Sequence, residues 1–271
     1  MQSIQEILVK KNIRSHTNEG IIVCNVESAK SGFDLTKEIL YKVIDKTTIL
    51  FLSGGRTPKD LYTILSKEER LHPRGVALID ERYGSPTHSN SNEKMLKDTG
   101  LLRYLDYNDV PFYPILQNPS RHPRESEDQI LDQVENDNKR KETAQLYDDK
   151  LRSLLSVFQK HIAILGVGLD GHTAGIAGNR PDFQNPLFDS DRKNLLVSEF
   201  DDTKGIFKER ITMTFLGLSH MDFLLVLVFG EDKQKALEVM FSPGSEKDIP
   251  SRFFKRPEIA KKTVLITDQN I

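Results

Sequence analysis

Short apolar runs alternate along the chain with longer stretches in which apolar positions recur at helical spacing. An apolar run without polar alternation predicts a strand that is covered on both faces of its sheet. Such runs occupy residues 20–26, 48–52, 75–79, 161–165, 195–200, 211–215, 223–229 and 263–267. A further run, residues 110–116, contains Pro111 and Pro114, which favour the edge of a sheet.

The intervening segments predict helices at residues 28–41, from Pro58 onward, at 91–98 and at 231–241. The segment 125–159 is strongly polar at first and then places apolar side chains on one helix face: Leu146, Leu151, Leu154, Leu155 and Phe158. Residues 121–143 have the charge density of a disordered linker, or of a solvated loop leading into that helix. We favour the second interpretation, because the apolar spacing takes over without a break rich in Gly, Ser or Pro.

Regular strand–helix alternation predicts an α/β protein. Right-handed crossovers then build a doubly wound, mostly parallel sheet flanked by helices, in a modified Rossmann-like arrangement. No change in composition marks a boundary along the chain, so we predict a single domain over residues 1–271.

Composition narrows the class of protein. The 271 residues include 38 basic and 40 acidic side chains, whereas a general nucleic-acid-binding protein needs a basic excess. A single cysteine, Cys24, excludes an intramolecular disulfide and a multi-cysteine metal centre, and is typical of a reducing compartment. The first eleven residues lack the apolar segment of a signal peptide, and the run at 223–229 is too short to cross a bilayer. We expect a cytoplasmic protein with no membrane or nucleic-acid partner.

Ligands bind at the carboxyl ends of the strands in a doubly wound sheet. The loop after residues 48–52 reads Ser-Gly-Gly-Arg-Thr-Pro, from Ser53 to Pro58. Gly54 and Gly55 allow a close approach of the backbone to a ligand, and the helix that starts there offers free amides to an anion. Arg56 adds a charge, and Thr57 is the expected N-cap. The pattern predicts a phosphate site, and an ordinary capped turn is the alternative.

Two further strand ends carry unusual residues. Asp80, Glu81 and Arg82 follow the run at 75–79, and charges there need either ion partners in a solvated loop or a function. Residues 166–174 read Gly-Val-Gly-Leu-Asp-Gly-His-Thr-Ala, which fits a dinucleotide pattern, but the following glycines and proline interrupt the crossover helix that such a site requires. His172 can act as a general base near neutral pH, oriented by Asp170, or it is a surface histidine in a turn.

The charged segment 201–210 supplies Lys204, Lys208 and Arg210 close to the predicted anion site. The remaining histidines show no metal-ligand spacing, so we predict neither a metal site nor a cofactor; they are His16, His72, His88, His122, His161 and His220.

Taken in order, these segments resemble the superfamily of 6-phosphogluconolactonases and glucosamine-6-phosphate deaminases. The resemblance covers residues 49–237 and is carried by Ser-Gly-Gly-x-Thr-Pro at 53–58, Asp-Glu-Arg at 80–82 with Ser-Asn at 91–92, Ala-x-x-Tyr at 144–147, Gly-x-Gly-x-Asp-Gly-His-Thr-Ala at 166–174, Arg-Ile-Thr-x-Thr at 210–214 and Gly-x-x-Lys at 230–233.

Two departures from the deaminase pattern point to the lactonase branch: Ala177 replaces a glutamate, and Arg82 replaces a tyrosine. The chain departs from the lactonase pattern too. Arg56 replaces a small hydroxyl residue, residues 175–178 replace Ser-Leu-Phe-Pro, and Lys-Gly-Ile-Phe at 204–207 replaces a Lys-Pro-Pro segment. These departures affect the expected shape of the pocket rather than its polar groups.

The resemblance implies hydrolysis of 6-phosphoglucono-δ-lactone to 6-phosphogluconate, a step of the pentose phosphate pathway. His172 would activate water, Asp170 would orient His172 or a substrate hydroxyl, and Arg82 or a glycine-loop amide would stabilise the oxyanion. The expected substrate and phosphate contacts are Ser53, Gly54, Gly55, Arg56, Asp80, Lys204 and Arg210. Two alternatives remain for this small-molecule sugar-phosphate site: an amino-sugar-phosphate deaminase with Asp80 as its base, and a sensor that binds without turnover.

Overall fold

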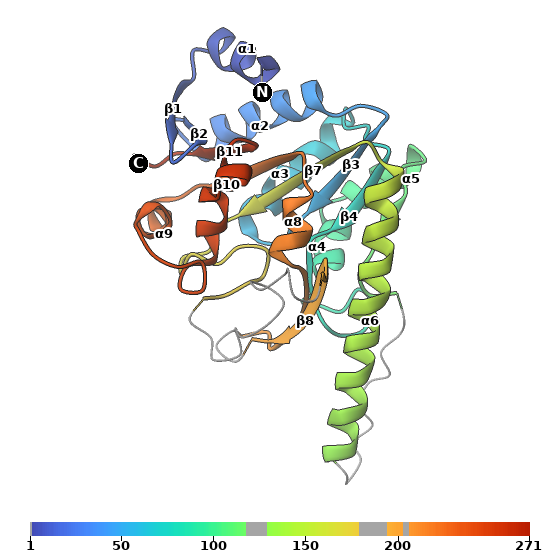
Figure 1. Cartoon of the computed structure of the whole chain (residues 1–271). Helices are drawn as coiled ribbons and strands as arrows, with labels where there is room; N and C mark the ends of the chain where they lie inside the picture. The colour runs from blue at the N-terminus through green and yellow to red at the C-terminus, as the bar shows by residue number, and fades with distance from the viewer. Residues whose placement is uncertain (1, 118–128, 179–193, 203–205) are drawn as a thin grey trace.

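An eight-stranded sheet forms the centre of the computed structural model, which describes residues 2–117, 129–178, 194–202 and 206–271 (Figure 1). The strand order is β1-β2-β11-β10-β7-β3-β4-β6, in which β1 is antiparallel to β2 and the other neighbours pair in parallel. The strands are β1 (Arg14–Asn18), β2 (Ile21–Asn25), β3 (Thr48–Leu52), β4 (Gly75–Leu78), β6 (Phe112–Tyr113), β7 (Lys160–Gly166), β10 (Phe223–Val228) and β11 (Thr263–Thr267). This arrangement confirms the predicted α/β class with its mostly parallel sheet, and β6 lies at the edge as its prolines indicated.

The connections wind in two directions. From β2 the chain passes through β3 and β4 to the β6 edge, and from β7 it returns through β10 and β11. Because parallel crossovers are right-handed, the two directions place their helices on opposite faces of the sheet. The helices are α1 (Gln2–Lys10), α2 (Ala29–Val43), α3 (Arg56–Glu68), α4 (Asn92–Asp98), α5 (Leu101–Tyr107), α6 (Gln129–Val157), α8 (Phe215–Ser219), α9 (Gln234–Phe241) and α10 (Pro257–Ala260), with 3₁₀ turns at Glu231–Lys233 and Pro250–Lys255.

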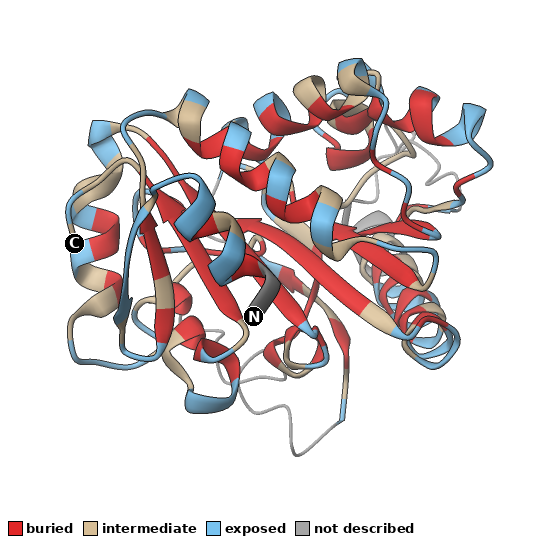
Figure 2. Ribbon diagram, turned by 90° about the horizontal axis from the view of Figure 1, so that it is seen from above, coloured by how far each residue is buried: buried red, intermediate tan, exposed pale blue. Residues whose placement is uncertain are grey.

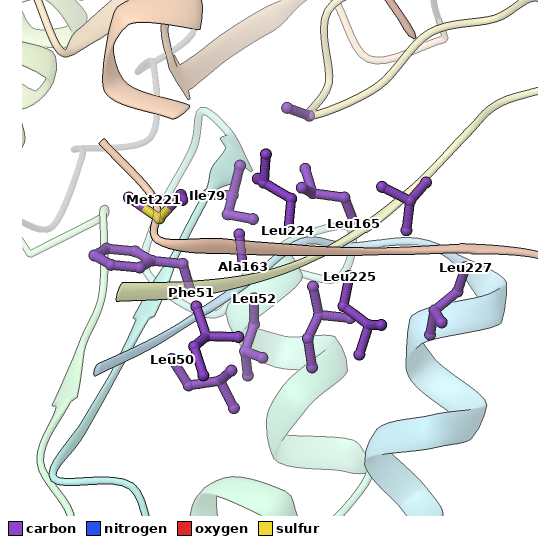
Figure 3. Packing of buried hydrophobic residues seen from close by; sticks show 14 of the residues in the cluster. Leu50, Phe51, Leu52, Ile79, Ala163, Leu165, Met221, Leu224, Leu225 and Leu227 are labelled. Carbon is purple, nitrogen blue, oxygen red and sulfur yellow. The ribbon is translucent and has the colours of Figure 1, made fainter. Parts of the chain in front are cut away.

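The core lies on both faces of the sheet. Consecutive side chains of β3, Leu50, Phe51 and Leu52, are all fully buried, as are Leu224 and Leu225 of β10 (Figure 3). Figure 2 shows the strands buried through the middle of the molecule, with exposed residues on the helices and loops around them. The unbroken apolar runs in the sequence therefore have the expected cause.

A second, antiparallel sheet of three strands stands beside the first. It consists of β5 (Asp80–Arg82), β9 (Glu209–Met213) and β8 (Val197–Asp201), in that order. The local pattern does not indicate that these segments leave the main sheet, and residues 80–82 were expected in a loop. The burial of β8 is interrupted instead of being continuous: Val197 and Phe200 are buried, whereas the two residues between them are half-buried and Asp201 is exposed.

The remaining differences concern polar segments. The edge strand β1 was not expected, because its residues Arg14–Asn18 are polar and mostly exposed. On α6, Tyr147, Leu151 and Leu154 are buried as predicted, but Leu146 is exposed. The helix begins at Gln129, which supports the interpretation of the later part of 121–143 as a helix start, while residues 118–128 lie outside the described residues.

Candidate active site

The loops that follow β3 and β7 diverge at the carboxyl edge of the sheet. These two strands are neighbours, but the chain leaves β3 toward one edge and β7 toward the other, which makes this the topological switch point where α/β sheets bind ligands. A cleft of about 910 Å³ opens there. Its lining includes nine of the ten predicted site residues, namely Ser53, Gly54, Gly55, Arg56, Asp80, Arg82, Asp170, His172 and Arg210. The tenth, Lys204, lies outside the described residues.

The loop after β3 has the features of an anion site. Ser53 is buried, and its hydroxyl finds no hydrogen-bond partner among the described residues. Gly54 packs so closely on Asn92 that a Cβ would lie 2.0 Å from the Asn92 Oδ1 atom. Gly55 precedes α3 with a φ of 114° and provides no side-chain cap. The prediction that Thr57 is the N-cap is therefore wrong. The first amides of α3 have no side-chain cap and are left for a ligand.

The loop after β7 holds the predicted acid–base pair. The His172 Nδ1 atom lies 2.5 Å from the Asp170 Oδ1 atom, and about half of the imidazole is exposed. The hydrogen bond from His172 lowers the pKa of Asp170 to about 2, so the carboxylate is ionised at neutral pH and can only accept. Nδ1 therefore carries the proton of the neutral imidazole, and Nε2 is left as the acceptor that a general base needs.

The three charges of β5 have different surroundings. Asp80 is buried on the cleft wall, where the Asn92 side-chain amide donates to its Oδ2 atom over 3.1 Å. Glu81 faces away from the cleft and accepts the backbone N–H groups of Arg82, Asn92 and Glu93 over 2.6–3.0 Å. Its burial raises its pKa to about 7, against the effect of those three amides.

Two arginines face each other at the cleft. Arg82 on β5 is the direct cross-strand partner of Arg210 on β9. Asp202 accepts from the Arg210 Nε atom over 3.2 Å, and burial lowers the pKa of Arg210. Like charges in this position repel each other, so an anion between them would be stabilised by both.

The site residue that the predictions missed is Lys233, whose Nζ atom donates to the Val167 carbonyl over 2.8 Å. Burial lowers the pKa of this lysine. The neighbouring Asp232 carboxylate lies 3.9 Å from the exposed Arg56 guanidinium. Arg56 therefore lines the cleft but also has an acidic neighbour that offsets part of its charge. The sequence signal was present, because Gly-x-x-Lys at 230–233 directly follows a predicted strand.

No cluster of three or more possible metal ligands occurs within the part of the chain that the structure describes. In that same part, every helix is either too short or too polar to cross a membrane.

Comparison with known proteins agrees with this geometry. The family model described as glucosamine-6-phosphate isomerases/6-phosphogluconolactonase matches residues 27–265. A 6-phosphogluconolactonase of Synechocystis sp. is 30% identical over 214 residues, which are 75% of this chain and 76% of the relative, and one of Neisseria meningitidis is 27% identical over 231 residues, which are 83% and 87%.

Solved structures share the fold. A 6-phosphogluconolactonase from Shewanella baltica superposes with a TM-score of 0.67 at 18% identity, over 94% of this chain and 98% of that one. One from Thermotoga maritima gives 0.62 at 23% identity, over 94% and 100%. From the extent of the family match, the chain belongs to the family of glucosamine-6-phosphate isomerases and 6-phosphogluconolactonases.

Proposed function

We propose that this protein hydrolyses 6-phosphoglucono-δ-lactone to 6-phosphogluconate in the pentose phosphate pathway. The observation that carries the proposal is the ionised Asp170 bonded to His172 in the same cleft as an uncapped helix start and two facing arginines. Curated relatives named 6-phosphogluconolactonase, similar over about three quarters of this chain or more, support the same activity.

The phosphate binds at the loop after β3. Its amides at Gly54 and Gly55 and the unpartnered Ser53 hydroxyl supply donors, and the positive end of the α3 dipole favours an anion. Arg56 and Lys233 add positive charge at the mouth of this loop. This end of the substrate is thereby anchored, which directs the lactone ring toward His172.

His172 Nε2 removes a proton from water while the water oxygen forms a bond to the lactone carbonyl carbon. The imidazolium that results is stabilised by the Asp170 carboxylate. Arg82 stabilises the tetrahedral oxyanion, and Arg210 on the facing strand binds the substrate near it. The bond from the carbonyl carbon to the ring oxygen then breaks, and His172 returns its proton to the leaving ring oxygen, which becomes the hydroxyl of 6-phosphogluconate.

The deaminase alternative is less favoured by the same cleft. The position of the deaminase glutamate is Ala177, which offers no carboxylate and does not line the cleft. Asp80 is present on the cleft wall, where it can bind a substrate hydroxyl, but the exposed acid–base pair is His172 with Asp170. A sensor that only binds sugar phosphates would have no need of such a pair.

The decisive experiment is lactone hydrolysis with the product coupled to its dehydrogenase, after subtraction of spontaneous hydrolysis. We expect rapid turnover by the parent and a loss of at least about tenfold in His172→Ala, since general-base catalysis contributes roughly 10²–10⁴. His16→Ala is the matched control, because His16 lies exposed on β1 away from the cleft. Parent rates at background would overturn the proposal, and ammonia release from glucosamine 6-phosphate, or binding without turnover, would then identify the alternatives.

A further inference from the structure

The ring of Phe207 covers the guanidinium of Arg82. The Arg82 Cζ atom lies 5.0 Å from the centroid of the ring, within the range of a cation–π contact, and both residues line the cleft. Phe207 comes from the connection between β8 and β9, whereas Arg82 comes from β5, so the contact joins segments far apart in the sequence.

The hydrogen bond of the Arg82 guanidinium is also to a neutral group. Its Nη1 atom donates to the Asn90 carbonyl over 2.7 Å. Among the described residues no carboxylate forms an ion pair with Arg82, whereas the facing Arg210 pairs with Asp202. The two arginines therefore have different partners, a neutral carbonyl for Arg82 and a carboxylate for Arg210, although they are cross-strand partners.

This difference has a chemical consequence. A carboxylate that fixed Arg82 would also neutralise it, and the guanidinium would then stabilise a developing oxyanion less well. An aromatic ring orients the guanidinium through its face while leaving the positive charge unpaired. The ring also restricts a long side chain that would otherwise lose rotamer entropy when it meets the transition state.

We propose that Phe207 is a positioning residue for Arg82, which holds the guanidinium at the reacting carbonyl without neutralising it. This inference rests on the proposed function, because it depends on Arg82 as the group that stabilises the oxyanion. It predicts that Phe207 affects the rate only through Arg82.

A double-mutant cycle in lactone hydrolysis tests this dependence. Phe207→Leu keeps an apolar side chain but removes the ring, and we expect kcat to fall roughly 3- to 30-fold with little change in KM, the rate equivalent of one cation–π contact. In the Arg82→Met background, the same substitution should change kcat by less than about twofold. Phe207→Tyr keeps the ring and should restore most of the activity. Tyr107→Leu, an exposed aromatic on α5 outside the cleft, is the matched control.

Equal losses in both backgrounds, or a loss confined to KM, would overturn the inference, since Phe207 would then contact the substrate directly. A parent without lactonase activity would instead overturn the proposed function. The contact itself is tested independently by urea unfolding of the parent, the two single variants Phe207→Leu and Arg82→Met, and the double variant. We expect the shifts in midpoint of Phe207→Leu and Arg82→Met to be non-additive, and additive shifts would show that the ring does not hold Arg82.

Discussion

The imidazole of His172 rests on the backbone of Gly168 at a distance that admits no side chain. A Cβ on Gly168 would lie 2.0 Å from the Nδ1 and Cε1 atoms of the ring. The Gly168 N–H also donates to the His172 carbonyl over 2.8 Å, so the loop holds both ends of the residue. The orientation of the proposed base therefore depends on a glycine that takes no part in the chemistry.

We expect Gly168→Ala to lower kcat for lactone hydrolysis at least about tenfold, because a displaced imidazole no longer aligns with the water and the carbonyl. Gly166→Ala, at the end of β7 directly before this loop, is the matched control. Its Cβ would meet the Leu227 carbonyl oxygen at 3.6 Å, an ordinary contact, so the substitution should change kcat by less than about twofold. Circular dichroism confirms the fold of both variants. Equal rates for the two would show that the ring can move without loss of function.

At the scale of elements, Glu81 joins β5 to the start of α4. Its carboxylate accepts the N–H groups of Asn92 and Glu93, which are the first two residues of α4 and lack acceptors within the helix. Asp80 and Arg82 flank it on the same short strand and reach the cleft. One buried carboxylate thus fixes the strand that carries two site residues.

The pH dependence of stability in the Glu81→Gln variant tests this contact between β5 and α4. Burial raises the pKa of Glu81 in the folded protein to about 7, against about 4.3 when unfolded, so the folded state binds more protons between these values. Relative to that of Glu81→Gln, the free energy of unfolding of the parent should therefore fall as the pH rises across this window, by on the order of 3 kcal/mol. Above pH 7 the difference between the two proteins should be constant. Urea unfolding from pH 4 to 8 measures the difference. If the parent instead became more stable with rising pH relative to Glu81→Gln, the three amides would outweigh burial and the pKa of Glu81 would be lowered.

At the scale of the molecule, the buried strands of the main sheet could be predicted from the sequence, whereas its edge strand β1 and the separation of the small sheet could not. Strands such as Thr48–Leu52 and Thr263–Thr267 are buried throughout and mostly apolar because helices cover both faces, and this pattern is local. The strand Asp80–Arg82 has three charges and depends on contacts that the fold creates: it pairs with Glu209–Met213, more than a hundred residues away, and Glu81 accepts two amides of α4. No local pattern predicts such a pairing.

The site divides in the same way. Residues on the glycine-rich loops, such as Ser53 and His172, could be predicted because strand ends in an α/β sheet converge. Contacts that only the folded chain creates could not be predicted, and the contact of Phe207 with Arg82 is an example. Lys233 carried a signal in Gly-x-x-Lys, but its bond to the Val167 carbonyl did not. The N-cap predicted at Thr57 was wrong because the helix begins at Arg56, with Gly55 as its N-cap two residues before Thr57.

A buried arginine joins the small sheet to α6. Arg140 of α6 is almost fully buried and lies 2.7 Å from a carboxylate oxygen of Glu199, 2.7 Å from one of Asp201 and 3.2 Å from one of Glu209. These carboxylates belong to β8 and β9, so a single positive charge holds three negative charges of the small sheet against α6. Removing one partner from a fully buried ion pair typically costs about 3–5 kcal/mol, and the cost should be smaller here because the carboxylates of Asp201 and Glu209 are partly exposed.

We therefore expect Arg140→Met to open the small sheet and to leave the main sheet folded. Hydrogen exchange should show the amides of β8 and β9 losing most of their protection, while those of β10, at the centre of the larger core, remain protected. Lactone hydrolysis should fall at least about tenfold, because Arg82 and Arg210 both lie on the small sheet. Arg140→Lys keeps the charge and should retain more of both properties. Full protection and activity in Arg140→Met would show that the Asp148 carboxylate, which accepts the amides of Leu196 and Val197, is sufficient to hold the sheet in place.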